Sequence, residues 1–373
     1  MKNKLNLLIA AGGTGGHLFP AVAVLEQLEE LTDNNINAVF VGTSDRIESR
    51  VVPDHGYELV TIPVKGFSGL SPKTLSLPFR VILSIQRCRK LIRERKIDFV
   101  ICTGAYISYP AGLAASLEKK KLFIMESNVS PGKTIRMLAG RATNIFTSFK
   151  ETEVFFAPKN RAKVKMLGNP VRRSILKEID QISARDKFEL QPDMRTVLVF
   201  GGSLGARAIN LAIEKSLDKL SKCAFQMLWQ TGVNYTFDGN LPENIKMVKF
   251  IEDMASAYAA ADLVVSRSGA TSVAEICCTG KPSILIPLPT ASNNEQALNA
   301  LALLNNNAAI LLDNSKAEAY LADLIISTLS EQKLLEEMGN KAKALGRPDA
   351  GHTIADFILS GDSIEQIASE ETF

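Results

Sequence analysis

Histidine is scarce in this 373-residue chain, which carries three, at positions 17, 55 and 352. Histidines so few and so far apart argue against a histidine-rich metal site. The five cysteines form no C-x-x-C pair, and their odd number predicts buried thiols rather than disulfides or a zinc site. With 46% hydrophobic and 22% charged residues, the composition is that of a soluble globular protein, long enough for two domains.

Long uncharged runs are also rare. The stretch 99–117 carries no charge, but Gly104, Pro110 and Gly112 interrupt it, so a strand, a turn and a helix are favoured over a membrane span. The first residues, MKNK, lead through a short apolar run into a glycine-rich turn, without the cleavage site of a signal peptide. We therefore expect the chain to stay in the cytosol.

The N-terminal half is organised around the stretch 7–28, LLIAAGGTGGHLFPAVAVLEQL. An apolar strand breaks into a glycine-rich turn, and a helix follows whose first turn suits Pro20. The turn has glycine at positions 12, 13, 15 and 16. Because glycine lacks a Cβ, these N–H groups and the helix N-terminus can meet an anion, with His17 at the mouth of the turn. The spacing matches neither the dinucleotide fingerprint nor a Walker loop, and a tight turn of any α/β protein is the alternative.

A second glycine-rich turn repeats this pattern. Gly12-Gly13-Thr14 and Gly201-Gly202-Ser203 are 189 residues apart, and Gly16 and Gly205 keep the same offset. Each turn follows an apolar strand and opens a helix. Two similar halves are therefore predicted.

Apolar runs alternate with helical segments through both halves, which is typical of parallel sheets. Strands are expected near 36–42, 58–64, 98–103, 121–126, 144–148, 225–231, 245–250, 263–267, 282–288 and 308–312. Helices are expected near 76–95, 110–118, 132–140, 205–220, 254–260, 272–279, 294–306, 316–330 and 352–359. We predict two doubly wound Rossmann-like domains, residues 1–167 and 168–346, facing across a cleft, with a last helix within 347–373 packing back on the first domain.

The segment 266–285 offers a nucleotide site. A strand and a glycine turn lead into a helix that carries Glu275 in its first or second turn. A carboxylate there can accept both hydrogen bonds of a ribose diol, while the turn offers donors to a diphosphate. On this segment alone, a charge that complements the helix dipole is the favoured alternative.

The segment 80–96 is strongly basic, with seven basic residues against the single acid Glu94. Apolar residues lie ahead of it and within it, at Leu75, Leu77, Phe79, Ile82 and Ile85. Arg87, Arg89 and Lys90 carry the charge. This pattern suits a surface that rests on anionic lipid, and an ordinary crossover helix with a solvated basic face is an equal alternative. Nucleic acid is a weaker choice, because no aromatics alternate with the charges.

Eight motifs in order carry a family resemblance. They are GGTGGH (12–17), GAYIS (104–108), ESN (126–128), GNPVR (168–172), GGSLGAR (201–207), FIEDM (250–254), SRSGATSVAE (266–275) and the Gln296/Asn299 pair. From about residue 5 to about 350 the chain closely resembles the MurG family, the bacterial UDP-N-acetylglucosamine (UDP-GlcNAc) transferases that complete the lipid-linked disaccharide-pentapeptide of peptidoglycan. The resemblance implies a GT-B fold, with an N-terminal domain for the lipid-linked acceptor and a C-terminal domain for the UDP-sugar.

The resemblance also implies site residues. The donor would contact Thr14, Gly15, Gly16, Asn128, Arg172, Ser203, Ile251, Ala270, Thr271, Ser272, Val273, Ala274, Glu275 and Gln296. Of these, Glu275 would hold the ribose, Ile251 would abut the uracil and Gln296 would read the sugar hydroxyls. Tyr106 and Asn299 would contact the acceptor.

Three motifs depart from the family pattern. Met125 stands where the family often has histidine, Ala105 where it often has glycine, and Asn294-Glu295 where it often has Asp-His. Since a methionine cannot act as a base, position 125 has no catalytic role here.

The implied reaction is attack of the acceptor's 4-hydroxyl on the anomeric carbon, with inversion to a β-linkage. His17 is favoured as general base over Glu126, because it titrates near neutrality. No two aspartates are separated by one residue, so the Asp-x-Asp metal motif of other nucleotide-sugar transferases is absent, and we expect neither metal nor cofactor.

The resemblance implies a peripheral enzyme on the cytoplasmic face of the plasma membrane, with proteins of cell-wall synthesis and division as partners. Three alternatives stay open. They are a GT-B transferase for another glycolipid, a UDP-GlcNAc 2-epimerase, and a nucleotide-sugar-binding protein without turnover.

Overall fold

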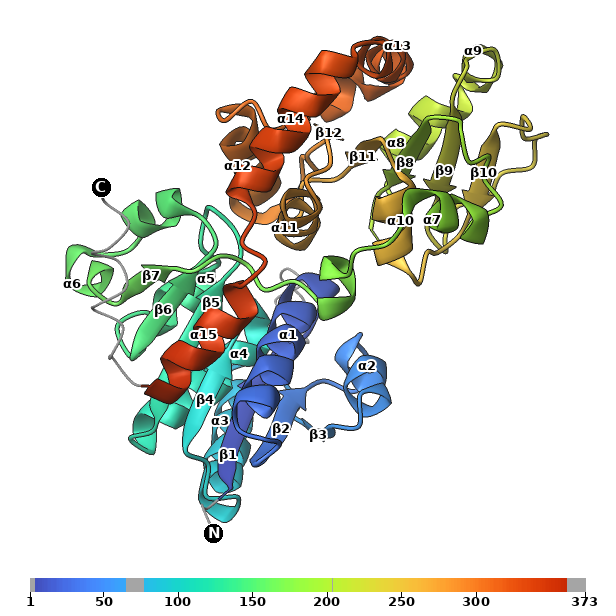
Figure 1. The fold of residues 1–373 in the computed structure, drawn as a ribbon. Coiled ribbons are helices and arrows are strands. Elements are labelled where there is room, and N and C mark those ends of the chain that lie inside the picture. Colours follow the sequence, from blue (N-terminus) through green and yellow to red (C-terminus); the bar gives the residue numbers. More distant parts are fainter. Residues whose placement is uncertain (1–3, 65–76, 203, 361–373) are drawn as a thin grey trace. The chain divides into compact units, whose positions relative to one another are not determined.

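The computed structural model describes residues 4–64, 77–202 and 204–360 (Figure 1). The chain divides into two compact units. Unit 1 comprises Met1–Arg172 with Asp349–Phe373, and unit 2 comprises Arg173–Pro348. The predicted membrane residue Leu75 and the predicted donor residue Ser203 lie outside the described residues, as does the side chain of Leu77.

Unit 1 contains a seven-stranded parallel sheet in the order β3-β2-β1-β4-β5-β6-β7 within the described residues. The strands are β1 (Leu5–Ala10), β2 (Ile36–Gly42), β3 (Glu58–Thr61), β4 (Phe99–Cys102), β5 (Lys121–Glu126), β6 (Asn144–Thr147) and β7 (Val164–Met166). The helices are α1 (Gly15–Leu31), α2 (Glu48–Asp54), α3 (Leu77–Glu94), α4 (Ala105–Leu117), α5 (Lys133–Leu138), α6 (Pro158–Arg161) and α15 (Ala350–Ser360).

The central strand β1 shows why this sheet needs helices on both faces. Successive side chains of a strand point to opposite faces, so Leu8 joins the core beneath α3 and α4 while Leu7 joins the core beneath α1 and α15. Both side chains are fully buried. The last helix, α15, returns to unit 1, where it packs on α1, and Phe357 meets Phe146 edge-on with ring centroids 5.4 Å apart.

Unit 2 repeats the architecture with a six-stranded parallel sheet, described in the order β10-β9-β8-β11-β12-β13. The strands are β8 (Thr196–Phe200), β9 (Gln226–Gln230), β10 (Ile245–Val248), β11 (Leu263–Ser266), β12 (Ser283–Leu285) and β13 (Ile310–Leu311). The helices are α7 (Gln181–Lys187), α8 (Arg207–Glu214), α9 (Leu217–Leu220), α10 (Met254–Ala260), α11 (Ala270–Thr279), α12 (Glu295–Leu304), α13 (Ala317–Ser330) and α14 (Gln332–Leu345).

The two strand orders place the glycine turns at equivalent points. In each unit the chain winds outward from a central strand, β1 or β8, and then restarts on its other side with β4 or β11. Ligands of open parallel sheets bind at this switch point, beyond the carboxyl ends of the strands. Both glycine turns leave the sheet there.

Three sequence predictions need correction. Helix α1 begins at Gly15, so Pro20 lies inside the helix rather than in its first turn. The helix expected near 205–220 is two helices, α8 and α9. Helices α2, α6 and α14 and strand β7 were not predicted. Helix α14 packs on α11, where Gly339 approaches the carbonyl of Gly280 so closely that a Cβ would lie 2.8 Å from it.

Candidate functional site

His17 lies in the first turn of α1, directly after the first glycine turn. The carbonyl of Thr14 accepts the N–H groups of His17 and Leu18, each at 3.2 Å, and this bonding starts the helix. Gly13, at φ +81°, has the left-handed conformation that favours glycine. The turn therefore sets the direction in which α1 presents the imidazole.

The imidazole of His17 is held by the loop after β4. Its Nδ1 lies 2.8 Å from the carbonyl oxygen of Thr103, and the Thr103 hydroxyl donates to the His17 carbonyl at 2.7 Å. A carbonyl only accepts, so Nδ1 carries the proton and Nε2 keeps its lone pair. A Cβ on Gly104 would lie 3.0 Å from the ring, so glycine is needed there. Burial lowers the pKa of His17, and the bond to Thr103 opposes this in part.

Glu126, the alternative base, is buried at the end of β5 with both oxygens engaged. Oε1 accepts from the backbone N–H of Asn128 at 2.9 Å and from its side-chain amide at 3.2 Å, and Oε2 accepts from Gly132 N at 2.9 Å. These bonds shape the loop 126–132. The geometry therefore favours a loop-ordering role for Glu126 and also uses the Asn128 amide within the loop.

Met125, which replaces the histidine frequent in the family, points into the core. It is 3% exposed and belongs to the same hydrophobic cluster as Phe123 and Phe146. The substitution thus fills the interior of unit 1.

Two further predicted residues of unit 1 lie near the first glycine turn. The guanidinium of Arg172 stacks over the ring of Phe19, with its Cζ 4.8 Å from the ring centroid, and Phe19 itself lies against Gly15. A Cβ added to Gly13 would lie 4.0 Å from the ring of Tyr106. His17, Arg172 and Tyr106 are therefore gathered around one turn by three different segments.

The second glycine turn is braced by neutral groups. The side chain of Gln230 donates to the carbonyl of Gly202 at 3.0 Å and accepts the N–H of Ile251 at 2.8 Å. Gly205, at φ +79°, lies directly against Gly232 and the Thr231 carbonyl, where a Cβ would collide. Ile251 is 4% exposed, which leaves little of its side chain for a uracil in this state.

The loop after β11 leads into α11, whose first turn carries the predicted phosphate contacts. Ser268 is fully buried, and its hydroxyl donates to the carbonyl of Gln296 at 2.8 Å. Asn299, predicted to contact the acceptor, is fully buried in unit 2 and donates to the Ser268 carbonyl at 3.2 Å. Its observed role is to brace this loop. The buried Thr271 hydroxyl has no hydrogen-bond partner among the described residues.

Glu275 lies in the second turn of α11 and is 4% exposed. The hydroxyl of Tyr258 donates to its Oε2 at 3.1 Å. The side chain of Gln296 accepts the N–H of Leu288 at 2.9 Å. The carboxylate and the amide thus lie beyond the carboxyl ends of β11 and β12, in the same unit.

Helix α3 carries the predicted membrane residues. Its exposed face begins with Phe79, Ile82 and Leu83, which are 71%, 58% and 37% exposed. Arg87 and Lys90 continue this face at helical spacing and are exposed, whereas Ile85 is half-buried.

Arg89 pairs with Glu118 at 2.7 Å, and Arg93 and Arg89 together hold the pKa of Glu118 down to about 2. Arg89 is therefore engaged with the protein. Among the described residues, no helix has both the length and the apolarity to cross a bilayer.

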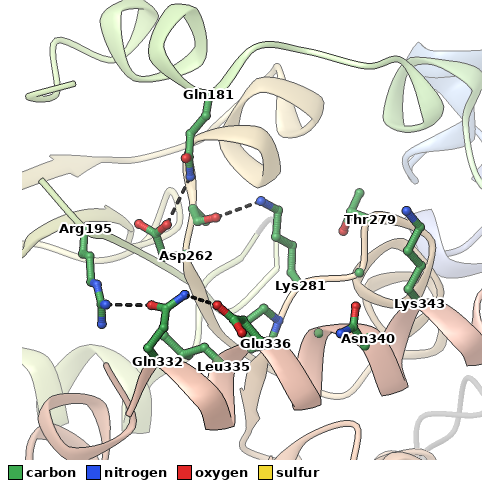
Figure 2. A pocket seen from close by; sticks show the side chains of 14 residues that line it. Gln181, Arg195, Asp262, Thr279, Lys281, Gln332, Leu335, Glu336, Asn340 and Lys343 are labelled. Atoms are coloured by element: carbon green, nitrogen blue, oxygen red, sulfur yellow. Dashed lines mark hydrogen bonds between the residues drawn. The ribbon is translucent and has the colours of Figure 1, made fainter. Parts of the chain in front are cut away.

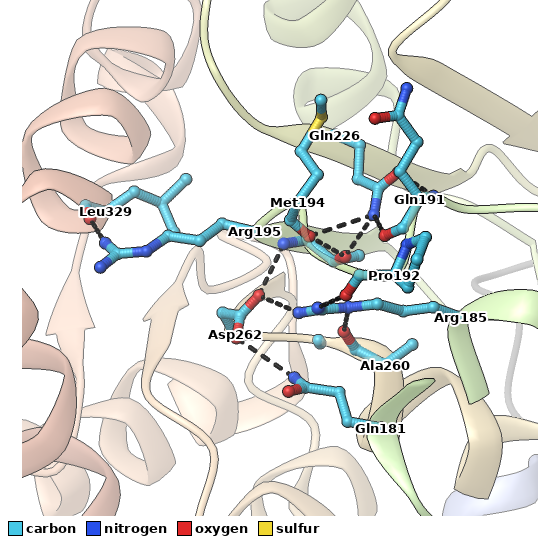
Figure 3. Close-up of polar contacts among 12 residues, drawn as sticks. Gln181, Arg185, Gln191, Pro192, Met194, Arg195, Gln226, Ala260, Asp262 and Leu329 are labelled. Atoms are coloured by element: carbon cyan, nitrogen blue, oxygen red, sulfur yellow. Dashed lines mark hydrogen bonds and ion pairs between the residues drawn. The ribbon is translucent and has the colours of Figure 1, made fainter. Parts of the chain in front are cut away.

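A polar pocket of about 480 Å³ lies at the amino ends of β8, β11 and β12, opposite the carboxyl ends that carry the predicted site (Figure 2). The lining residues Asp262 and Arg195 are held by hydrogen bonds from and to neighbouring residues. Asp262 accepts from Arg185 at 2.7 Å, from the Thr196 N–H at 2.6 Å and from Gln181 at 3.2 Å (Figure 3). Arg195 donates to Gln332 at 2.7 Å (Figure 2). The pocket contains no predicted site residue, and its network braces α7 and α14 against the sheet.

Sequence reasoning missed three residues of the site, Phe19, Thr103 and Tyr258, and also Glu48, whose carboxylate accepts the N–H of Gly13 at 2.8 Å. Thr103 directly precedes GAYIS at the end of a predicted strand, and this position was a usable signal. Glu48 had none, because it follows β2 in a segment with no motif. Within the described residues, no group of three or more His, Cys, Asp or Glu side chains is placed to hold a metal ion.

Comparisons with known proteins agree with this architecture. The glycosyltransferase family 28 N-terminal domain matches residues 7–147, and the family 28 C-terminal domain matches residues 196–354. The crystal structure of Acinetobacter baumannii MurG superposes with a TM-score of 0.74 at 27% identity, covering 95% of this chain and 99% of that one. UDP-GlcNAc 2-epimerase from Neisseria meningitidis, bound to UDP-GlcNAc, gives a TM-score of 0.67 at 14% identity over 95% and 99% of the two chains, a likeness of fold alone.

A curated relative covers nearly the full length. The UDP-N-acetylglucosamine--N-acetylmuramyl-(pentapeptide) pyrophosphoryl-undecaprenol N-acetylglucosamine transferase of Chlorobaculum tepidum is 40% identical over 367 residues, which are 95% of this chain and 99% of the relative. The predicted GT-B fold and the predicted resemblance are both confirmed. The chain belongs to the MurG family of glycosyltransferases.

Proposed function

We propose that the chain transfers N-acetylglucosamine from UDP-GlcNAc to the 4-hydroxyl of the MurNAc of undecaprenyl-pyrophosphoryl-MurNAc-pentapeptide (lipid I), forming the β-1,4-linked lipid II. The names of its relatives describe this transfer. The observation that carries the proposal is the distance of 2.8 Å between Nδ1 of His17 and the carbonyl oxygen of Thr103. Because a carbonyl oxygen only accepts, we assign the proton of the neutral imidazole to Nδ1, which leaves Nε2 as a proton acceptor.

Unit 2 binds the donor in this proposal. Glu275 accepts the ribose hydroxyls, and the first turn of α11 meets the diphosphate with backbone N–H groups and the positive end of its dipole. The Thr271 hydroxyl, which lacks a partner among the described residues, donates to a phosphate oxygen. Gln296 meets the sugar.

Unit 1 supplies the base. As the acceptor's 4-hydroxyl attacks the anomeric carbon, Nε2 of His17 takes its proton, and the bond to the diphosphate breaks with its electron pair on UDP. The lowered pKa of His17 keeps the imidazole neutral at physiological pH, which is the form that accepts a proton. The three bonds that engage Glu126 support its assignment to loop order.

UDP release, measured with and without lipid-linked MurNAc-pentapeptide, tests this function. We expect release that depends on the acceptor, together with a product that carries one more N-acetylglucosamine, and no effect of a chelator. Conversion of UDP-GlcNAc to its 2-epimer without acceptor would favour the epimerase. Binding of UDP-GlcNAc without either reaction would favour a binding protein.

We further propose that α3 rests on the anionic cytoplasmic face of the plasma membrane. Phe79, Ile82 and Leu83 provide the apolar contact, and Arg87 and Lys90 provide attraction of about 1 kcal/mol per basic residue near an anionic leaflet. A polyprenyl acceptor stays in the bilayer because each buried CH₂ contributes about 0.8 kcal/mol, so the enzyme must come to the surface.

Charge reversal tests the membrane contact. The double variant Arg87→Glu/Lys90→Glu should lose sedimentation with anionic vesicles at low salt and keep its activity on a short-chain soluble acceptor. Arg89 is left unchanged because its reversal would also break the pair with Glu118. Lys333→Glu/Lys341→Glu, on the exposed surface of α14, makes the same change in net charge and should sediment like the parent. Unchanged sedimentation of the α3 variant would place the contact elsewhere.

A further inference from the structure

Glu48 is a fully buried carboxylate behind the first glycine turn. It is the first residue of α2, the helix that follows β2 in the chain (Figure 1), and its hydrogen bonds place it at the carboxyl ends of the neighbouring strands β1 and β2. None of the roles assigned above uses it. A charge with no water around it is costly unless hydrogen bonds compensate, so its placement calls for an explanation.

The contacts of Glu48 join the two strand ends. Oε2 accepts the N–H of Gly13 at 2.8 Å, and Oε1 accepts the N–H and the hydroxyl of Thr43 at 2.9 and 2.8 Å. All three partners are neutral donors, and within the described residues Glu48 forms no ion pair. Its hydrogen bonds therefore join the backbone of the turn to Thr43, directly after β2.

Two glycines make room for this side chain. A Cβ on Gly12 would lie 2.5 Å from the Glu48 carboxyl carbon, and a Cβ on Gly42 would lie 2.5 Å from its Cγ. Real Cβ contacts do not come so close, so Gly12 and Gly42 are required wherever Glu48 occupies this position. The first glycine of the GGTGGH motif thus serves the buried carboxylate.

We propose that Glu48 is a positioning residue for the catalytic base. By holding the N–H of Gly13, it fixes the turn that leads through Thr14 into the first turn of α1, where His17 lies four residues further on. The same bond withdraws the Gly13 N–H from any bound phosphate. This inference rests on the proposed function, because the readout in turnover depends on His17 acting as base.

A double-mutant cycle with His17 tests the inference. Glu48→Gln keeps the shape of the side chain, but its amide presents N–H donors to a site lined by donors, so one bond is lost. With a soluble acceptor, kcat should fall by about 10- to 100-fold, as expected for a misplaced catalytic group, while the Kd for UDP stays within twofold. In the His17→Ala background the same substitution should change kcat by less than about threefold, because residues that act as a unit are not additive.

Glu29→Gln is the matched control. Glu29 lies near the other end of α1, and its carboxylate accepts a hydrogen bond from Tyr57 at 2.9 Å. Its kcat should equal that of the parent. An equal loss from Glu48→Gln in both backgrounds, or a lower melting temperature with kcat within twofold of the parent for the folded fraction, would overturn the positioning role. If Glu48→Gln does not fold, Thr43→Val removes one of the three bonds and should lower kcat several-fold in the parent background alone.

Hydrogen exchange separates this inference from the proposed function. Faster exchange of the amides of residues 13–18 in Glu48→Gln, with no change elsewhere in α1, is expected whether or not the parent transfers sugar. Unchanged exchange there would overturn the inference. A parent chain without transferase activity would overturn the proposed function alone.

Discussion

The two glycine turns have the same place in their sheets and nearly the same sequence, yet their surroundings differ. Behind the first turn lies the buried carboxylate of Glu48, which accepts the Gly13 N–H. The second turn is braced by the neutral amide of Gln230, which donates to the Gly202 carbonyl. Helix α1 begins at Gly15, inside its motif, whereas α8 begins at Arg207.

This difference divides the work of the reaction. A turn backed by a carboxylate is poorly suited to a diphosphate, because like charges repel and one N–H is already engaged. The same rigid turn suits a residue that must be held in place, and it leads directly to His17. The second turn, in unit 2, is braced by the neutral amide of Gln230, so no charge behind it repels a diphosphate. We therefore expect changes in unit 1 to act on turnover and changes in unit 2 to act on UDP binding.

The largest effect is expected at His17. His17→Ala should lower kcat by about 10²- to 10⁴-fold and leave the UDP affinity unchanged, because a general base acts only on the chemical step. Steady-state kinetics and isothermal titration with UDP measure the two effects separately. A loss of tenfold or less, with Glu126→Gln much worse, would give the role of base to Glu126.

Glu275→Ala should have the opposite signature. Two charge-assisted hydrogen bonds to the ribose are lost, and each contributes about 1.5–3 kcal/mol, so UDP should bind at least about 100-fold more weakly. Titration with UDP decides this. Tyr258→Phe, which removes the hydroxyl bonded to Glu275, is the control for the placement of the carboxylate. It should weaken UDP binding by less than Glu275→Ala does. Affinity within twofold of the parent would leave Glu275 with a role in helix electrostatics.

The pH dependence should distinguish the turns again. Burial lowers the pKa of His17 below 6.5, so its base form persists at neutral pH and kcat should fall only as the pH drops through this lowered value. His17 should also make the free energy of unfolding depend on pH in the same direction. The unfolded chain binds more protons below pH 6.5 than the folded chain, so the folded state becomes less stable as the pH falls there. The affinity for UDP-GlcNAc, whose diphosphate has no group that titrates in this range, should not follow this limb. A kcat profile with no acidic limb over the whole pH range in which the chain stays folded would contradict the role of His17.

Thr271→Val should weaken UDP binding by less than Glu275→Ala does, and it should also raise the stability of the free protein. A single hydrogen bond contributes about 0.5–1.5 kcal/mol, so UDP should bind several-fold more weakly, while the free protein becomes slightly more stable because a buried hydroxyl without a described partner is removed. Ser283→Ala is the matched control, since this hydroxyl also lacks a partner among the described residues but lies at the amino end of β12. It should leave UDP affinity unchanged. Equal affinities for both variants would remove Thr271 from the site.

The smallest effect is expected at Ala105, which follows β4 at φ +56° where the family often has glycine. The left-handed conformation costs an L-residue about 1–2 kcal/mol, and glycine returns about 0.5–1 kcal/mol of this as backbone entropy. Ala105→Gly should therefore stabilise the chain by less than about 1 kcal/mol in urea unfolding, whereas Ala111→Gly, inside α4, should destabilise it. A destabilising Ala105→Gly would show that the strain is relieved by its surroundings.

Local sequence patterns were sufficient for much of this site. Apolar strands that break into glycine located both turns and the start of α11, and hence His17 and Glu275. The patterns could not reveal Glu48, because its burial depends on the pairing of β1 with β2 and not on its neighbours in sequence. The bond between His17 and Thr103, 86 residues apart, is equally non-local. Asn299 was assigned to the acceptor from the family resemblance, and a resemblance in motif does not show that the side chain is buried.

The division between the turns is tested most directly by a crystal structure of the chain with UDP bound. We predict the diphosphate at the first turn of α11, with a phosphate oxygen accepting from Thr271, the ribose hydroxyls on Glu275, and the Gly13 N–H still bonded to Glu48. A diphosphate bound by the N–H groups of Gly13 to Gly16 would contradict it.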